Sequence, residues 1–255
     1  MTDSFAGRTA LVTGAGRGIG RAIAVGLGRA GATVALLARS EHELAETAAL
    51  VEESGARSLV VPADLRDDGQ LAHAVTRIRD EWGGVDILVN NAAVVWPLAP
   101  SVRVDVTEWA AAMKINVIAA VTLTFAFLPG MVERGWGRIV NVSTGGVADP
   151  GAMIGGNAYI ASKSALEGHT INLGLELDGS GVTANVYRPG PVDTAIQTWI
   201  RDQDPAEIGT ALHRRFVRTH ADGKLLTPEH SAGSLLARLT ADDRSAQIWD
   251  VFGPA

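Results

Sequence analysis

The sequence contains no cysteine among its 255 residues. Disulfide bonds and catalysis by a thiolate are therefore excluded, and nothing in the composition requires an oxidising compartment. The residue pattern indicates no metal site either. We accordingly expect chemistry without thiols, disulfides or a bound metal ion.

Positive charge is in the minority. Lysine and arginine together number 22 against 28 for aspartate and glutamate, and the formal net charge is −6. A nucleic-acid partner therefore has no electrostatic support. Three neighbouring arginines, Arg214, Arg215 and Arg218, are better interpreted as the solvated face of a helix than as a site for a polyanion.

Long hydrophobic runs are scarce as well. No apolar run reaches the roughly 20 residues that a membrane-spanning helix requires. The amino-terminal residues lack the basic region and the apolar stretch of a signal peptide. We therefore expect a cytoplasmic protein that does not associate with a membrane.

Short apolar segments alternate with longer amphipathic ones along the chain. Apolar, β-branched runs with little alternation indicate buried parallel strands at 9–12, 33–37, 58–61, 87–89, 139–142, 183–186 and 248–251. Helical patterns lie between them at 19–30, 41–54, 67–81, 105–133, 158–178 and 228–239. This order predicts a doubly wound α/β fold (Rossmann fold), with a seven-stranded parallel sheet and helices on both faces.

No linker, repeat or low-complexity tract divides the sequence, so we expect one domain over residues 1–255. The segment 191–227 departs from the alternation. It is rich in charged residues and contains Trp199 and Phe216. We interpret it as a helical lid over a substrate, placed before the last helix of the domain.

A glycine-rich turn, Thr13-Gly-Ala-Gly-Arg-Gly-Ile-Gly20, follows the first predicted strand and precedes a helix. Glycines at such a place allow a tight turn and let backbone N–H groups approach a pyrophosphate at the helix N-terminus. A glycine-rich turn alone is weak evidence, because glycine also serves ordinary turns. The strand–turn–helix context favours a nucleotide site.

Tyr159 and Lys163 are four residues apart in a predicted helix, so they share one face. A neighbouring ammonium group stabilises phenolate and would lower the tyrosine pKa from about 10 toward the range of an acid/base catalyst. Such pairs are common on solvated helix faces. The pair therefore gains meaning only if other residues converge on it.

Six motifs in order resemble the short-chain dehydrogenase/reductase family, and the match covers nearly the whole chain. They are the glycine loop ending at Gly20, Asp64 after the third strand, the triplet Asn90-Asn91-Ala92, Asn116, the pair Tyr159 and Lys163, and the turn Arg188-Pro-Gly-Pro-Val-Asp-Thr194. Within this family Asn90 is expected to support the sheet rather than to take part in chemistry.

The resemblance implies a dinucleotide cofactor and a catalytic group. The residues implied for the cofactor are Gly14, Arg17, Gly18, Ile19, Gly20, Arg39, Ser40, Asp64, Leu65, Asn91, Ala92, Tyr159, Lys163, Pro189, Val192 and Thr194. The catalytic residues implied are Asn116, Thr144, Tyr159 and Lys163. The family's usual hydroxyl residue is a serine, and the aligned position here is Thr144, with Ser143 as the alternative.

Charge after the second strand indicates which dinucleotide binds. An acidic residue there would receive the ribose 2′-hydroxyl of NAD and repel a 2′-phosphate. This place holds Ala38, followed by Arg39 and Ser40, and Arg17 in the glycine loop can reach the same region. Guanidinium groups suit a phosphate dianion, so we predict NADP(H).

The resemblance implies carbonyl reduction and its reverse, alcohol oxidation. Tyr159 would donate the proton as general acid, and Lys163 would lower the tyrosine pKa and bind the nicotinamide ribose. Thr144 would hydrogen-bond the substrate oxygen. Asn116 would hold a water that links Lys163 to solvent.

The substrate is less well defined. Family position suggests pocket residues at Trp96, Ser143, Met153, Asn157, Gln197 and Trp199, which favour an apolar or aromatic carbonyl compound. The segments 190–197, 223–226, 231–236 and 247–250 resemble the sepiapterin and benzil reductase branch. The physiological substrate, its stereochemistry and the preferred direction do not follow from the sequence.

Two other functions remain open at this point. A 3-oxoacyl-carrier-protein reductase would need a basic patch for an acidic carrier, which Arg201, Arg214, Arg215 and Arg218 could provide. A catalytically silent NADP-binding sensor is the alternative outside enzymes, since a fold does not dictate its function. The family also implies a homodimer or homotetramer through the helices at 105–133 and 158–178.

Overall fold

The computed structural model describes residues 4–253 of the chain. Residues 1–3 carry part of the amino terminus from which the lack of a signal peptide is predicted, so that part of the prediction lies outside the described residues. Residues 254–255, at the end of the predicted 1–255 domain, lie outside them too. The described chain begins with a turn that buries the Phe5 side chain in the core.

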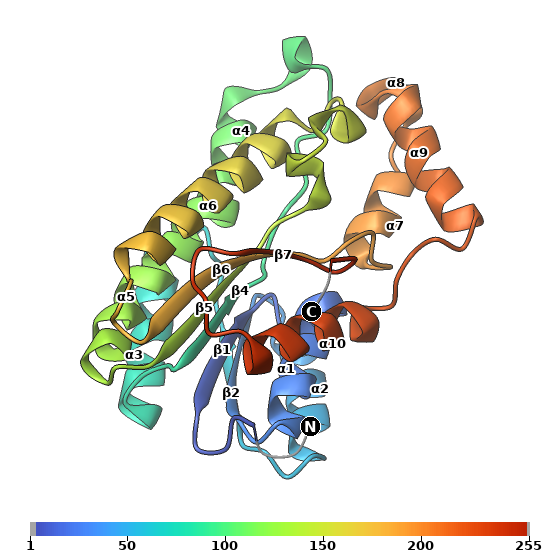
Figure 1. The fold of residues 1–255 in the computed structure, drawn as a ribbon. Helices are drawn as coiled ribbons and strands as arrows, with labels where there is room; N and C mark the ends of the chain where they lie inside the picture. The colour runs from blue at the N-terminus through green and yellow to red at the C-terminus, as the bar shows by residue number, and fades with distance from the viewer. Residues whose placement is uncertain (1–3, 254–255) are drawn as a thin grey trace.

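Seven strands form one parallel sheet, which confirms the predicted fold class (Figure 1). The strand order is β3-β2-β1-β4-β5-β6-β7, and each neighbouring pair is parallel. Branched apolar residues fill these strands because helices cover both faces of the sheet. The bounds are β1 Thr9–Thr13, β2 Thr33–Ala38, β3 Ser58–Pro62, β4 Ile87–Asn90, β5 Gly137–Val142, β6 Val182–Arg188 and β7 Ile248–Asp250.

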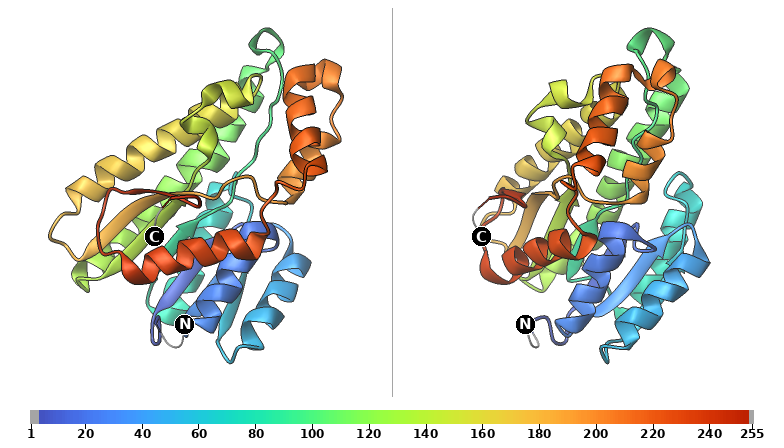
Figure 2. Two further views of the ribbon diagram at one scale, coloured as in Figure 1. Left: turned by 45° about the vertical axis from the view of Figure 1, so that its right-hand side comes forward. Right: turned by 90° about the vertical axis from the view of Figure 1, so that its right-hand side faces the viewer.

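Two layers of helices enclose the sheet, as Figures 1 and 2 show from three directions. One face carries α1, α2 and α10, and the other carries α3, α5 and α6. Side chains alternate along a strand, so Ala10 and Val12 of β1 pack with the first group and Leu11 packs with the second. The bounds are α1 Gly18–Arg29, α2 Glu41–Glu52, α3 Asp68–Trp82, α5 Ala119–Glu133, α6 Asn157–Glu176 and α10 Pro228–Ala241.

One helix is more apolar than the sequence analysis predicts for any part of the chain. The helix α4 (Val106–Met113), a π-helical turn η2 (Lys114–Ile118) and α5 form a continuous helix of 28 residues, long and apolar enough to cross a membrane by length and composition. The prediction that no segment reaches this length is wrong. Half of its most apolar window is buried in the fold, where Leu123 and Phe127 pack in the core, so core packing accounts for part of its hydropathy.

The strand order changes direction between β1 and β4, because β2 and β3 follow on one side of β1 and the remaining strands follow β4 on the other. Loops leaving the carboxyl ends of these two strands diverge and leave a crevice between them. Inside the sheet, Asn90 at the end of β4 donates from Nδ2 to Asn141 Oδ1 of β5 at 2.8 Å. This buried amide pair joins the two strands directly below the crevice.

The segment predicted as a lid contains three short helices, α7 (Ala195–Arg201), α8 (Pro205–Ile208) and α9 (Thr210–Ala221). They stand beyond the carboxyl edge of the sheet, at the same end as the loop before α4 (Figures 1 and 2). Arg103 links that loop to α8, donating to Glu207 Oε2 at 2.9 Å and to the Ala206 carbonyl at 3.0 Å. The 3-10 turns are η1 Ser101–Arg103, η3 Gly145–Val147 and η4 Pro150–Met153.

The turn between α6 and β6 contains two glycines with nearly the same left-handed backbone, which makes a matched test of packing. Gly179 (φ +75°) faces open space, whereas a Cβ on Gly181 (φ +79°) would stand 2.0 Å from the Gly135 carbonyl oxygen. Gly179→Ala should cost about 1–2 kcal/mol of unfolding free energy from backbone strain alone. Gly181→Ala should cost about 1–3 kcal/mol more. Urea unfolding measures both, and equal losses would contradict the close approach.

Candidate active site

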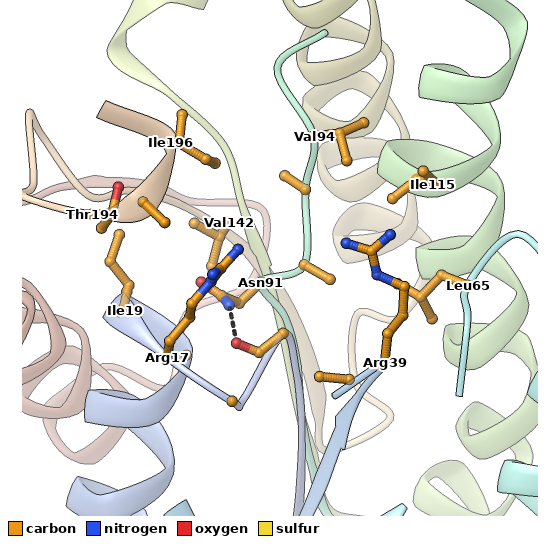
Figure 3. A pocket seen from close by; sticks show the side chains of 18 of the residues that line it. Arg17, Ile19, Arg39, Leu65, Asn91, Val94, Ile115, Val142, Thr194 and Ile196 are labelled. Atoms are coloured by element: carbon orange, nitrogen blue, oxygen red, sulfur yellow. Dashed lines mark hydrogen bonds between the residues drawn. The ribbon is translucent and has the colours of Figure 1, made fainter. Parts of the chain in front are cut away.

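A cavity of about 710 Å³ opens at the carboxyl edge of the sheet, where β1 and β4 diverge. Its walls come from residues that end or follow the first six strands, from the first turns of α6, from η2 and from the starts of α2 and α7. Figure 3 shows Arg17 and Arg39 entering the cavity after β1 and β2, with Ile196 on α7 and Ile115 on η2 forming other walls. Doubly wound folds bind nucleotides at this kind of switch point.

The glycine loop brings the start of α1 against the end of β1. Gly14 (φ +65°) and Gly18 (φ +56°) adopt left-handed backbone angles. A Cβ on Gly20 would stand 2.2 Å from the Gly14 carbonyl oxygen and 2.5 Å from Asn91 Nδ2, so only glycine fits there. The free N–H groups in the first turn of α1 therefore border the cavity, where they suit a pyrophosphate.

Thr13 and Asn91 hold the ends of β1 and β4 together beneath this loop. Thr13 Oγ1 accepts hydrogen bonds from the main-chain N–H groups of Asn91 and Ala92, each at 3.0 Å. The Asn91 side chain returns a hydrogen bond to the Thr13 carbonyl at 2.9 Å. Both sides of the crevice are thereby fixed relative to each other, with Asn91 and Ala92 on its wall.

Guanidinium groups surround the end of the cavity beside β2 and β3. Arg17 Nη1 lies 3.4 Å from Glu43 Oε1, and both side chains keep solvent contact. Hydrogen bonds from the Arg66 side chain lower the pKa of Asp64, and the charge of nearby Arg39 lowers it further. A negatively charged ligand group would meet Arg17 and Arg39 here, and the Glu43 and Asp64 carboxylates also line the cavity.

These features fit a dinucleotide with a 2′-phosphate. The glycine loop lets the first turn of α1 pack against the end of β1, with Gly14, Gly18 and Gly20 on the cavity wall, so its backbone N–H groups can approach a pyrophosphate. Arg39 and Ser40 follow β2, where the adenosine ribose is expected in this fold. Ser40 caps α2 by accepting from the Glu43 N–H at 3.3 Å, which leaves its hydroxyl hydrogen free to donate.

Tyr159 and Lys163 line the cavity together from the first turns of α6. Lys163 is only 2% exposed, and its Nζ donates to the Val142 carbonyl at the end of β5 at 2.7 Å. Burial lowers the pKa of Lys163 to about 8, and the negative charge of Glu167 opposes that fall. Lys163 therefore changes charge within the working range of an enzyme, unlike a solvated lysine with a pKa of about 10.4.

The predicted direction of the Tyr159 pKa is wrong in this structure. Burial raises the pKa of Tyr159, and hydrogen bonding with the Thr144 side chain opposes the rise. The reason is that the Lys163 ammonium turns toward the Val142 carbonyl and lies 6.0 Å from the centre of the Tyr159 ring. Desolvation of the phenolate therefore outweighs attraction by the ammonium, and the phenol stays protonated at neutral pH.

The two hydroxyl residues after β5 have different partners. Ser143 Oγ donates to the buried Glu167 carboxylate at 2.6 Å. Thr144 Oγ1 accepts from the Gly146 N–H at 3.2 Å and also meets the Tyr159 phenol. The hydroxyl beside the tyrosine is therefore that of Thr144, which agrees with the register chosen from the sequence, whereas Ser143 is engaged with α6.

Asn116 lies in the π-helical turn η2, an irregularity that is frequent at functional sites. Its Oδ1 accepts from the Val94 N–H at 2.8 Å, while Nδ2 donates to the Val94 carbonyl at 2.8 Å and to Ser162 Oγ at 2.9 Å. Asn116 thus connects the chain after β4 to the helix that carries Tyr159 and Lys163. The predicted water beside it stays a prediction.

The cavity brings together nearly all residues predicted to hold the cofactor. Val192 is the exception, since it is buried and pairs with Leu226 in an isolated bridge. Several lining residues were missed by sequence reasoning. They are Leu37, Glu43, Ala63, Ile115, Val142, Ala195 and Ile196. Most adjoin predicted residues in sequence, so widening each motif by one position would have found them, whereas Glu43 reaches the cavity only through the packing of α2.

Of the six predicted substrate residues, only Ser143 lines this cavity. Trp96 packs against the core on the α3 and α5 face, and Asn157 Oδ1 accepts from Trp109 Nε1 at 2.9 Å. Trp199 on α7 is 37% exposed, and Gln197 is partly buried. Met153 belongs to an apolar cluster that packs against Tyr159. A substrate role for these five residues stays a prediction.

An apolar cluster lies between Tyr159 and the three short helices. Its buried members are Val95, Leu98, Met153, Ile200, Ile208 and Leu212, and Tyr159, Ile160, Ile196 and Phe216 pack against it. The cluster joins the chain after β4 to α7, α8 and α9. A molecule approaching the Tyr159 phenol from this side would meet hydrocarbon surfaces.

Comparison with known proteins gives a consistent result. The family described as short chain dehydrogenase matches residues 8–205. The ketoacyl reductase HetN of Nostoc sp. is 36% identical over 189 residues, which cover 74% of this chain and 65% of HetN. The 3-oxoacyl-[acyl-carrier-protein] reductase FabG of Pseudomonas aeruginosa is 36% identical over 191 residues, covering 75% of this chain and 76% of FabG. The aligned part thus spans less than two thirds of HetN.

Solved structures share the whole fold. A proposed NAD(P) dependent gluconate 5-dehydrogenase from Beutenbergia cavernae, with NADP bound at low occupancy, superimposes with a TM-score of 0.81 and 34% identity. The superposition covers 96% of this chain and 95% of that one. The likeness therefore extends beyond the nucleotide-binding half to the segment that carries α7, α8 and α9.

The arginines at the cavity mouth allow a test of whether the site prefers NADPH to NADH. Arg39→Ala should weaken NADPH binding about tenfold, or about 1.4 kcal/mol, and leave NADH binding nearly unchanged, because only the 2′-phosphate is affected. Fluorescence titration of both nucleotides measures this. Arg77→Ala, an exposed arginine on α3, is the matched control for the change in net charge. A parallel loss of both affinities would contradict phosphate recognition by Arg39.

Proposed function

Because the chain belongs to the short chain dehydrogenase family, we propose that it is an NADPH-dependent oxidoreductase that reduces a ketone or aldehyde carbonyl and catalyses the reverse alcohol oxidation. The observation that carries the proposal is the position of Tyr159 and Lys163 on the wall of a cavity shaped for a dinucleotide. NADP(H) is supported by Arg17 and Arg39 at the cavity mouth and by the NADP-bound structural relative.

The chain's own residues would bind, orient and control one proton. A bound nicotinamide supplies hydride chemistry. The Tyr159 phenol donates its proton to the carbonyl oxygen of the substrate as charge develops there, and the Thr144 hydroxyl hydrogen-bonds the same oxygen. Since burial raises the pKa of Tyr159, the phenol is in its acid form at neutral pH, which suits the direction of reduction.

Lys163 and Asn116 support this proton transfer. We assign Lys163 the nicotinamide ribose, and its ammonium lies 6.0 Å from the centre of the Tyr159 ring. With a pKa of about 8, it is charged below that pH and loses its charge above it. Asn116 holds η2 against Val94 and Ser162, and we keep for it the water that links Lys163 to solvent.

The substrate class we propose is an apolar or aromatic carbonyl compound. The support is the hydrocarbon cluster beside Tyr159, which includes Met153, Ile200 and Leu212. A relation to the sepiapterin and benzil reductase branch rests on the C-terminal motifs, and it is part of this proposal.

A second candidate is a 3-oxoacyl-carrier-protein reductase. The names of two relatives, HetN and FabG, favour it. In addition, α9 turns Leu212 and Phe216 inward and presents Arg214, Arg215 and Arg218 to solvent. This exposed basic face on a protein of net charge −6 could receive an acidic carrier that delivers a tethered acyl group.

We propose that the chain works in the cytoplasm as a homodimer or homotetramer. The support for assembly is apolar surface on the long helices, where Ile118 and Phe125 of the η2–α5 helix and Leu175 of α6 are 48%, 57% and 66% exposed. Exposed apolar side chains gathered on neighbouring helices are typical of subunit contacts.

A carbonyl panel with NADPH tests the reaction and the substrate class together. We expect NADPH oxidation with aryl ketones or diketones, and Tyr159→Phe should bind NADPH normally but lose at least about 100-fold in kcat, because the proton donor is gone. Absorbance of NADPH reports turnover. Preference for acyl thioesters would select the carrier-protein alternative, and silence on every carbonyl would favour the sensor function.

The neighbouring hydroxyls give a separate test of the catalytic group. Thr144→Ala should lower kcat about 100-fold or more, since it removes a hydrogen bond to the reacting oxygen. Ser143→Ala should cost about tenfold or less, because its hydroxyl is bound to Glu167. Steady-state kinetics of the two variants decide. A severe loss confined to Ser143→Ala would place the catalytic hydroxyl one residue earlier.

A further inference from the structure

A buried carboxylate lies one helical turn beyond Lys163, and the mechanism above does not use it. Glu167 is 6% exposed, although a buried carboxylate without partners would be strongly unfavourable. Its two oxygens receive three hydrogen bonds. Ser143 Oγ and Arg188 Nε donate to Oε1 at 2.6 and 2.9 Å, and Arg188 Nη2 donates to Oε2 at 2.7 Å.

Each partner of Glu167 comes from a different element that borders the cavity. Ser143 follows β5 directly before Thr144, and Arg188 ends β6 directly before Pro189 on the cavity wall. Glu167 itself lies on α6 with Tyr159 and Lys163. The carboxylate therefore fixes the ends of two strands and the catalytic helix relative to one another, at the level where their side chains meet the cavity.

We propose that Glu167 is a positioning residue for the proton-transfer group: it clamps Ser143 and Arg188 to the helix of Tyr159 and provides the counter-charge that keeps the buried Lys163 ammonium protonated. The inference rests on the proposed function only where catalysis is measured. The effect of the Glu167 charge on Lys163 can be measured in the folded protein without any catalytic activity.

The surroundings of Lys163 make the electrostatic part specific. On its own helix it faces the phenol of Tyr159 and the carboxylate of Glu167, with Arg188 of β6 held on the far side of that carboxylate. The end of β5 contributes the neutral Val142 carbonyl, which accepts the hydrogen bond from Lys163 Nζ. The Glu167 carboxylate opposes the effect of burial on Lys163, because its negative charge raises the Lys163 pKa.

The sign of the effect can be tested. Glu167→Gln keeps the shape and the acceptor oxygen but removes the charge. Without that charge, burial acts on Lys163 unopposed, so its titration should move to lower pH than in the parent protein. The expected shift is about one pH unit, as for loss of an opposite charge in close proximity. A purely structural role for Glu167 would not move the titration in a folded variant.

The chain offers a direct measurement, because it contains only three lysines, Lys114, Lys163 and Lys224. With lysine labelled at Cε by ¹³C, the three resonances can be followed in a pH titration and assigned with Lys114→Arg and Lys224→Arg. We expect Lys163 to titrate near pH 8 in the parent protein and lower in Glu167→Gln. Glu176→Gln, an exposed residue of the same helix, should leave Lys163 unchanged.

A second variant keeps the test independent of folding. Glu167→Gln alone leaves the Arg188 charge without its partner, which can prevent folding. Glu167→Gln/Arg188→Gln removes both charges and retains amide hydrogen bonding, so it should fold, and Lys163 should again titrate at lower pH. The proposal is overturned if, in either folded variant, Lys163 titrates at the same pH as in the parent protein and in Glu176→Gln.

Catalysis separates this inference from the proposed function. If the chain reduces carbonyls, the alkaline limb of its kcat/KM profile should follow Lys163 to lower pH in Glu167→Gln, and kcat should fall more than KM changes. If the parent protein reduces carbonyls but the alkaline limb does not shift in Glu167→Gln, the reductase function is supported and the role of Glu167 is refuted. If the NMR titration of Lys163 shifts but the protein turns over no carbonyl compound, the role of Glu167 stands and the proposed reductase function is refuted.

Discussion

The site depends on one buried charge, the ammonium of Lys163. A cation removed from water is unfavourable unless dipoles and an opposite charge replace its hydration. The Val142 carbonyl and the Glu167 carboxylate supply these, and Arg188 and Ser143 in turn satisfy the carboxylate. The ends of β5 and β6 and the start of α6 are thus linked by electrostatics rather than by apolar packing alone.

On the opposite wall of the cavity, close packing depends on the absence of side chains at glycines rather than on charge. A Cβ on Gly20 would stand 2.2 Å from the Gly14 carbonyl oxygen, so glycine lets α1 begin this close to the end of β1, and Thr13 and Asn91 bridge β1 and β4 beneath it. The glycine loop and the wall that carries Tyr159 and Lys163 therefore border the same cavity at the switch point of the sheet. Asn116 connects them, because η2 binds both the chain after β4 and Ser162 on α6.

Sequence reasoning succeeded where a residue's role is fixed by its neighbours along the chain. The alternation of strands and helices and the glycine loop between β1 and α1 follow from local patterns at strand ends. It failed where the role depends on packing. The direction of the Tyr159 pKa was wrong because desolvation depends on the surrounding atoms, and the helix from Val106 to Glu133 exceeded the expected hydropathy because half of its apolar window faces the core.

The sequence by itself determined the fold class, since periodicity and the glycine turn dictate the sheet. It also predicted a nucleotide site and an acid/base pair at Tyr159 and Lys163, because residues four apart share a helix face. Only the tertiary structure decided how those groups behave. It brought Glu167, 24 residues from Ser143 and 21 from Arg188, onto both of them, and it turned Lys163 toward β5. Charges far apart in sequence interact through a shared buried space, and no local pattern encodes that proximity.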